Sequence, residues 1–512
     1  MRHPLLCYKD ETDQDHKERI PFMIKKILEI PVSASSYPFT SAARYLDFEQ
    51  YGYEEKEYYM EGTAHVYQSA GDTGEVEVKH RDVPYLNRLV IRTPKEPAKA
   101  SGNVVVEIIN PTSFMEIERM WILGYEKFMR DGDIYVGITS KPNTIAKMTE
   151  FDKERYGCLS WPNPSENEPF PFTMEEIRKK RLLPDIDIHY EPGLFWDMLT
   201  DLAWMLRSDE PMNPVRSFDH SYLYLTGWSQ SACYLFRYVN SFAYRDEVKR
   251  DGKVFDGYLA GGGVRNLIIP VNQYESAMDY DFRLKRIEHV EEPYISVQTE
   301  SENGRWDAFR TKRMDSDYPH FLYREYEVTG ASHDTMFSYV DYYQNDEDLK
   351  RIHHLPVYVG KHEEGNDYPS QFLFAAAFRN LFRWVREGAG PNSCERIPVD
   401  EFGRNRKDVF GNTKGGLRTC LLNYPTGRYH ITSTIEPGQS FLDPASTKDP
   451  LFGYQEAFSP SFLKELYGSL AHYEELCRED TKEQISKGFL CREDGEALVR
   501  MAVLLAKKRG LE

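Results

Sequence analysis

The chain has 512 residues, of which 40% are hydrophobic, and a formal net charge of −18 at pH 7. This length admits either several average domains or one elaborated α/β domain with a sizeable core. The negative charge argues against nucleic acid as a partner, because phosphate binding depends on a basic face, and against adsorption to an anionic membrane.

The seven cysteines form no recognisable pattern. They are scattered, odd in number and never arranged as Cys-x-x-Cys, so we expect neither a disulfide framework nor a zinc site. The first ten residues contain an apolar run of only three, too short for a signal peptide, and no stretch approaches the length of a membrane span. These features predict a cytoplasmic protein.

The N-terminal part predicts a polar arm followed by strands. Residues 1–20 are polar and charged, and residues 20–32 alternate in the manner of an early strand. The acidic, tyrosine-rich segment 44–61 is interpreted as a surface loop. Residues 63–67 and 87–92 then predict two strands with a turn-rich connection.

A βαβ unit comes next. Residues 102–110 form a near-continuous apolar run, as expected of a central strand covered on both faces. A helical stretch over 116–131 and a buried strand at 133–139 complete the unit, which implies a parallel sheet. Glu107 lies within the first strand, and because a buried carboxylate needs a partner, we expect a structural ion pair there.

Residues 156–192 interrupt this pattern. The segment is rich in proline, glutamate and basic residues, so it is interpreted as an excursion over the sheet and a candidate lid. An amphipathic helix at 194–206 follows it. The other expected elements are strands at 222–225, 254–260, 292–299 and 323–328, and helices at 231–240, 370–387, 461–478 and 493–508.

The most informative stretch connects the strand at 222–225 to the helix at 231–240. Its turn contains Gly227 and Ser229, and a serine at the apex of strand, sharp turn and helix has the geometry of a nucleophile elbow. Such a turn exposes the serine Oγ, and the N–H of the next residue, Gln230, points at a developing oxyanion. Ser231 stands where the Gly-x-Ser-x-Gly pattern has its second glycine, which keeps a small residue at that position.

A serine nucleophile needs a base and a carboxylate that orients the base, in the chain order Ser, Asp/Glu, His. His333 follows the strand at 323–328 through a short glycine-containing loop and is the candidate base. The strand at 292–299 is followed by Glu300 and Glu302. Glu302 is the favoured acid, with Glu300 as the alternative.

A second oxyanion donor is expected from the loop after residues 102–110. Pro111 has no N–H, which leaves the backbone groups of Thr112 and Ser113 as candidates.

No cofactor or metal is expected. The chain has no Walker-type loop, and the glycines at 261–263 lack the Gly-x-Gly-x-x-Gly spacing. Two patterns could suggest a metal, the adjacent histidines at 353–354 and the Asp-x-Asp-x-His pattern at 185–189. Neither has a supporting cluster of further ligands.

Ten short motifs across nearly the whole chain resemble a large bacterial α/β-hydrolase-domain family of serine hydrolases whose substrates are largely unassigned. The motifs are EGTAHVY (61–67), VVEIIN (105–110), RYGCL (155–159), GWSQS (227–231), FDGY (255–258), TESE (299–302), GASH (330–333), WVREG (384–388), GGLR (415–418) and LYGS (466–469). By this resemblance Ser229 is the nucleophile, His333 the base, and the turn at 300–302 supplies the acid. The family often has aspartate at the position of Glu302, which keeps Glu300 in contention.

The resemblance implies an α/β-hydrolase fold, a doubly wound and mostly parallel sheet with a lid insertion and a C-terminal extension. We assign 1–100 to an N-terminal arm and strands leading into the core, 101–390 to the hydrolase core, with the lid near 156–192, and 391–512 to the extension. The extension is expected to pack beside the core and help to wall the pocket.

These observations predict a serine hydrolase acting on a carboxylic ester of small to medium size and partly apolar character. An acyltransferase using the same triad is the alternative among enzymes, and a non-catalytic binding protein on a hydrolase scaffold is the alternative from another class. No pattern in the sequence predicts an oligomeric state.

Overall fold

The computed structural model describes residues 23–71, 74–173, 175, 187–250, 252–263, 267–275, 282–303, 312–440 and 445–512. The expected arm at 1–20 lies outside these residues, and the expected lid at 156–192 lies outside them in part.

Ten strands form one sheet in the order β1-β2-β3-β5-β4-β6-β7-β8-β10-β9. The strands are β1 (Ile24–Glu29), β2 (Tyr53–Ser69), β3 (Val76–Pro94), β4 (Asn103–Ile108), β5 (Ile134–Ile138), β6 (Tyr222–Trp228), β7 (Gly257–Gly261), β8 (Val290–Thr299), β9 (Ser316–Tyr318) and β10 (Phe321–Val328). The stretch from β5 through β10 is parallel, whereas β1, β2, β3 and β9 pair antiparallel with their neighbours. The predicted parallel sheet is thus confirmed.

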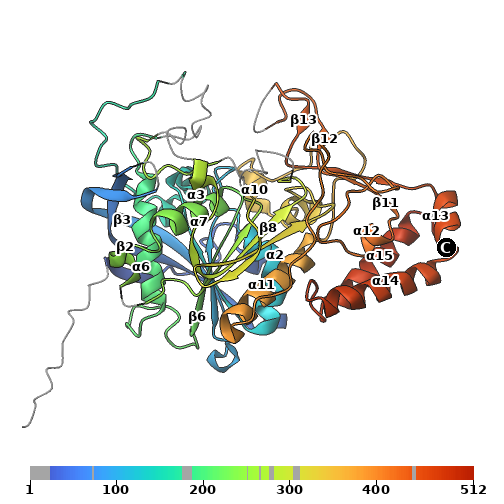
Figure 1. Cartoon of the computed structure of the whole chain (residues 1–512). Helices are drawn as coiled ribbons and strands as arrows, with labels where there is room; N and C mark the ends of the chain where they lie inside the picture. The colour runs from blue at the N-terminus through green and yellow to red at the C-terminus, as the bar shows by residue number, and fades with distance from the viewer. Residues whose placement is uncertain are drawn as a thin grey trace, which may run out of the picture.

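Four long helices cover this sheet. Helices α6 (Phe195–Leu206) and α7 (Gln230–Ser241) lie on one side, and α2 (Arg119–Asp131) and α11 (Ser370–Glu387) on the other (Figure 1). Both faces of the central strands are therefore removed from water, which explains why β4 is buried at every position and reads as a continuous apolar run.

The segment after α11 forms a separate layer at one side of the sheet (Figure 1). It contains α12 (Cys420–Asn423), α13 (Pro460–Tyr467), α14 (Leu470–Ser486), α15 (Gly495–Lys508) and the short strands β11 (Gly427–His430), β12 (Ser433–Thr434), β13 (Lys448–Asp449) and β14 (Tyr454–Ala457). The other α-helices among the described residues are α1 (Phe48–Tyr51), α3 (Ile145–Phe151), α4 (Lys153–Tyr156), α8 (Asp246–Lys249) and α10 (Glu347–Arg351).

Two sequence-based expectations about local structure are wrong. The segment 44–61 is not a surface loop throughout, because β2 begins at Tyr53 and pairs with β3 along its whole length, so its charged side chains find partners across the sheet. The helix expected over 461–478 is two helices, because Gly468 adopts a φ of 71° and ends α13.

Glu107 has a different partner from the one expected. Its carboxylate accepts hydrogen bonds from the backbone N–H groups of Met120 and Trp121, at 2.9 and 2.8 Å, and from the hydroxyl of Tyr135 at 2.9 Å. Burial raises the pKa of Glu107 to about 8, and these hydrogen bonds oppose the rise. The side chain therefore caps the start of α2 instead of forming an ion pair.

Within the described parts of the chain, none of the helices combines the length and the apolar character needed to cross a bilayer.

Candidate active site

Ser229 occupies the sharp turn between β6 and α7. Its backbone has φ 56° and ψ −118°, a conformation that a residue with a side chain rarely adopts. The Ser229 N–H donates to the carbonyl of Gly261 at 2.9 Å, which ties the turn to the end of β7. A strained turn held in this way leaves the Ser229 side chain only half-buried, above the carboxyl ends of the strands.

Gly227 permits the close approach of helix and strand at this turn. A Cβ at Gly227 would lie 2.7 Å from the carbonyl oxygen of Ser231, a distance that real side chains do not adopt. Ser231 is completely buried at the position where the motif usually has glycine. The departure from the Gly-x-Ser-x-Gly pattern is therefore accommodated by packing.

His333 is positioned over the turn by the loop that follows β10. Its Nε2 lies 3.0 Å from Ser229 Oγ, and its Nδ1 lies 2.7 Å from Glu302 Oε1. The His333 backbone N–H donates to Ser301 Oγ at 3.0 Å, which fixes the loop to the turn after β8. The structure thus brings Ser229, His333 and Glu302 into one hydrogen-bonded chain.

Glu302 is held by its second oxygen. Oε2 accepts from the backbone N–H of Thr299 at 2.6 Å and from the Thr299 hydroxyl at 2.8 Å, and the Glu302 side chain is inaccessible to solvent. These two donors leave Oε1 pointing at His333.

Glu300 faces elsewhere. Its carboxylate accepts from the N–H of Gly330 at 2.9 Å and from the hydroxyl of Thr413, and it pairs with Lys407 at 3.3 Å. It therefore connects the end of β8 to the C-terminal extension, and it makes no hydrogen bond to the imidazole of His333.

The loop after β4 approaches the turn from the other side. Asn110 Nδ2 donates to the carbonyl of Trp228 at 2.7 Å, and Asn110 Oδ1 accepts from the N–H of Thr112 at 2.8 Å. The Thr112 hydroxyl also donates to Gln230 Oε1 at 3.2 Å. The backbone N–H of Thr112 is thus already engaged, whereas Ser113 lines the same cavity as Ser229.

This cavity, of about 180 Å³, is lined in part by the C-terminal extension. Residues 439–440 and 449–452 form one of its walls, opposite the loop at 110–113. The wall is attached directly to the histidine loop, because the N–H of Asp334 donates to the carbonyl of Leu451 at 2.9 Å. The extension is therefore part of the site.

A buried ion pair also borders the cavity. Arg119 Nη1 lies 2.9 Å from Asp334 Oδ1 and donates to Ser338 Oγ at 2.9 Å. Both charges face His333. Burial lowers the pKa of His333, but the hydrogen bond to Glu302 and its charge outweigh burial, so the pKa lies above the usual value for histidine. Asp334 raises this pKa further, and Arg119 lowers it.

Asn110 and Arg119 were not predicted as site residues, and the expectation that the extension helps to wall the pocket did not indicate which of its residues do so. Asn110 was recognisable only as a polar residue ending an apolar strand. Arg119 and residues 449–452 carry no local signal, since their relation to His333 arises from contacts distant in the chain.

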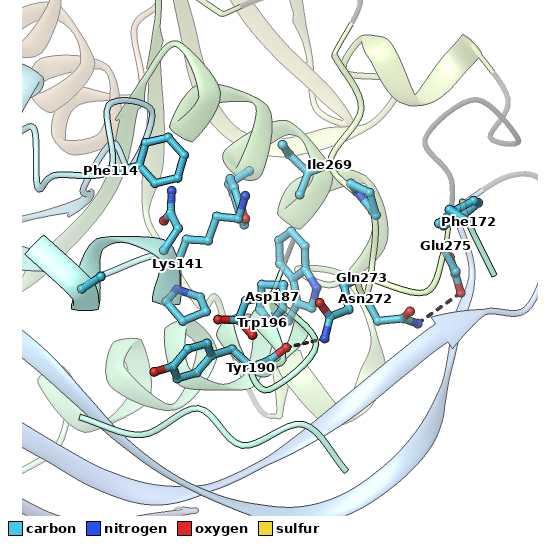
Figure 2. A pocket seen from close by; sticks show the side chains of 16 residues that line it. Phe114, Lys141, Phe172, Asp187, Tyr190, Trp196, Ile269, Asn272, Gln273 and Glu275 are labelled. Atoms are coloured by element: carbon cyan, nitrogen blue, oxygen red, sulfur yellow. Dashed lines mark hydrogen bonds between the residues drawn. The ribbon is translucent and has the colours of Figure 1, made fainter. Parts of the chain in front are cut away.

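A larger cavity of about 370 Å³ lies on the far side of the loop at 111–114. Phe114, Tyr190, Trp196 and Ile269 surround it, with Lys141 reaching in from the segment after β5 (Figure 2). The indole of Trp196 is fixed by donating to the carbonyl of Val271 at 2.8 Å. Thr112 and Ser113 line the cavity that contains Ser229 while Phe114 lines this one, so a single loop separates the two spaces.

The strand order, the helices on both faces and the serine at a strained strand–helix turn define an α/β-hydrolase fold. The chain belongs to the alpha/beta hydrolase domain family, which it matches over residues 25–500.

Similarity to individual proteins is low. Aspergillus niger EstA is 15% identical over 34% of this chain and 26% of its own, with a TM-score of 0.19, so the chain spans about a quarter of that protein's length. Esterase B from Lactobacillus rhamnosis is 12% identical over 53% of this chain and 75% of its own, with a TM-score of 0.28. A carboxylesterase from Lactobacillus plantarum, Cest-2923, is 10% identical over 53% of this chain and 95% of its own, with a TM-score of 0.29. No curated protein matches the chain.

Proposed function

We propose that this α/β hydrolase is a serine esterase that cleaves carboxylic esters through an acyl-enzyme. The observation that carries the proposal is the chain of contacts from Ser229 Oγ to His333 Nε2 at 3.0 Å and from His333 Nδ1 to Glu302 at 2.7 Å. Nucleophile, base and orienting carboxylate are each within the distance that proton transfer requires.

In this mechanism Ser229 attacks the ester carbonyl while His333 Nε2 accepts the serine proton. Glu302 accepts a hydrogen bond from His333 Nδ1 and stabilises the imidazolium that forms. The imidazolium then protonates the leaving alcohol as the carbon–oxygen ester bond breaks. A water molecule, deprotonated by His333, attacks the acyl-enzyme, and release of the carboxylic acid restores the Ser229 hydroxyl.

The tetrahedral oxyanion is stabilised by backbone N–H groups at the turn. Gln230 supplies the first, at the start of α7, where the helix dipole also favours negative charge. Because the Thr112 N–H donates to Asn110, we assign the second donor to Ser113. Thr112 then acts through its side chain, which holds Gln230 in place.

The two cavities support a substrate with one small polar part and one larger apolar part. The cavity at Ser229 is small and carries charged groups, whereas half of the residues that line the larger cavity are aromatic residues and prolines, with Lys141, Asp187 and Glu275 among the others. An ester whose apolar part extends past Phe114 would use both spaces.

A fluorophosphonate probe tests for an activated serine. The wild-type protein should be labelled at Ser229, as identified by mass spectrometry of the modified peptide. Ser229→Ala should remove the labelled site, and His333→Ala should slow labelling strongly because Oγ loses its base. A folded wild-type protein that stays unlabelled, or is labelled at another serine, would contradict the proposal and favour a binding role.

The pH dependence of kcat/KM tests the charges around His333. The base must be neutral, so activity is lost as the pH falls through the pKa of His333, which lies above the usual histidine value. Asp334→Asn removes a charge that raises this pKa and should move the acidic limb to lower pH. Arg119→Met removes a charge that lowers it and should move the limb to higher pH. If the acidic limb of the pH profile moves in the same direction in both variants, Asp334 and Arg119 do not have the opposite effects on the pKa of His333 that are proposed here.

A further inference from the structure

Three side chains with metal-binding atoms converge at the amino end of β8, away from the catalytic cavity. They are His289, Glu291 and His320, and their ligand atoms all lie within 4.8 Å of one another. Among the described residues this is the one group of three or more His, Cys, Asp and Glu side chains with that geometry. We propose that this group binds a divalent transition-metal ion of the zinc type.

The spacing of the ligand atoms is close to that of a tetrahedral zinc site. His289 Nε2 lies 3.3 Å from Glu291 Oε1, and His320 Nδ1 lies 3.8 Å from the same oxygen. Zinc bonds of about 2.0–2.1 Å to nitrogen and oxygen place neighbouring ligand atoms about 3.3–3.5 Å apart. A shift of a few tenths of an ångström in the exposed His320 side chain would bring its Nδ1 to this distance from Glu291 Oε1, and the ligand atoms of the two histidines already lie within 4.8 Å of each other.

The backbone brings the three residues together. His289 and Glu291 flank Val290 and project from the same face, as alternate residues of an extended chain do. The N–H of Val290 donates to the carbonyl of His320 at 3.2 Å, and Phe321 pairs with Val290 in the parallel ladder. This pairing holds the turn between β9 and β10 directly beside the two β8 ligands.

Neighbouring groups orient two of the ligands. Lys249 Nζ lies 3.4 Å from Glu291 Oε2, which leaves Oε1 for the metal. The ring of Tyr244 packs edge-on against His289 at 4.8 Å between centroids. The hydrogen bond that Lys249 donates to Glu291 is the kind of outer contact that orients a metal ligand.

The location indicates a structural role. The site lies at the amino ends of β8 and β10, whereas Glu302 and His333 follow the carboxyl ends of the same strands. With about 3.3 Å per residue, the length of β8 separates the two sites by about 30 Å. A bound ion would join the β9–β10 turn, at the edge of the sheet, to β8 and so stabilise that edge.

Calorimetric titration of the metal-free full-length protein with Zn²⁺ tests the proposal. The wild type should bind one equivalent, and Zn²⁺ should raise its thermal midpoint. Loss of an outer partner typically weakens metal affinity by about 10- to 100-fold. Lys249→Met should therefore weaken the affinity for Zn²⁺ by about 10-fold. His289→Gln and His320→Gln each remove a ligand and should weaken it by about 100-fold or more. Titration with Co²⁺ should give the visible absorption of a tetrahedral site in the wild type and not in the His289→Gln or His320→Gln variant.

His472→Gln is the matched control, since His472 is also exposed and lies 3.7 Å from a single carboxylate, Glu475. It should bind Zn²⁺ as the wild type does. A wild-type protein without saturable binding would overturn the proposal, as would a His289→Gln/His320→Gln double variant with undiminished affinity. The outcome is independent of esterase activity, because the Ser229→Ala protein should give the same titration.

Discussion

Replacing Glu302 by glutamine should reduce kcat for ester hydrolysis by about 10⁴-fold, the effect expected when a triad imidazole is held in the wrong tautomer. The two donors of Thr299 hold the oxygen at the Oε2 position, so the carbonyl of the new amide would remain there. Its NH₂ group would then face His333 Nδ1 and donate to it. His333 would carry its proton on Nε2 and could no longer accept the proton of Ser229.

Glu300→Gln is the matched control, because the two glutamates are two residues apart and both are buried. It should lower stability through the contacts with Lys407 and Thr413, while kcat per folded molecule changes little. Steady-state kinetics with a chromogenic ester, corrected for the folded fraction, measures both. A larger loss of kcat in Glu300→Gln than in Glu302→Gln would show that Glu300, and not Glu302, is the carboxylate that orients His333.

The sequence favoured Glu302 as the acid and kept Glu300 as the alternative. The chain order of Ser229, the 300–302 turn and His333 was readable because each follows a strongly apolar strand, and strand ends meet at one edge of a parallel sheet. Which glutamate turns toward the imidazole depends on side-chain contacts with Thr299, Gly330 and Thr413 that only the folded chain brings together.

Elements with a strong periodicity were predicted best. Helix α11 has the predicted limits, 370–387, because its apolar face is continuous and Gly388 ends it with a φ of 72°.

The prediction of a surface loop at 44–61 is wrong because the many charged residues of this segment suggested exposure to solvent. In the sheet, part of that segment belongs to β2, and charge on a strand is tolerated when partners on β3 and beyond neutralise it.

The family resemblance predicted that the extension helps to wall the pocket, but the residues that form this wall were not predictable from the sequence. Residues 439–452 contain many turn-forming residues and no periodic pattern, and the sequence gives no reason to connect them to a histidine more than 100 residues earlier. The connection is a backbone hydrogen bond between Asp334 and Leu451, which any pair of residues could make. Only the fold establishes that residues 439–440 and 449–452 line the same cavity as Ser229 and His333.

Replacing Glu57 by glutamine should lower the free energy of unfolding by about 3–5 kcal/mol, the range for removing one partner of a buried ion pair. Glu57 lies on β2 and is completely buried. It accepts hydrogen bonds from Arg88 on β3, from Arg155 on α4 at 2.5 Å and from the Tyr156 hydroxyl at 2.7 Å. Burial lowers the pKa of Arg88, but Glu57 and its neighbours raise it above its ordinary value, so the guanidinium stays charged.

A neutral glutamine at this position would leave Arg155 without its carboxylate, and Arg88 with only the more distant Glu116, at 3.3 Å. Since both guanidinium groups are buried, water cannot replace the lost charge. Denaturant unfolding followed by circular dichroism measures the change. Glu49→Gln, which removes an exposed partner of Lys95, should alter stability little, because solvent screens that pair. Equal stability of the two variants would show that Glu57 does not hold β2, β3 and α4 together.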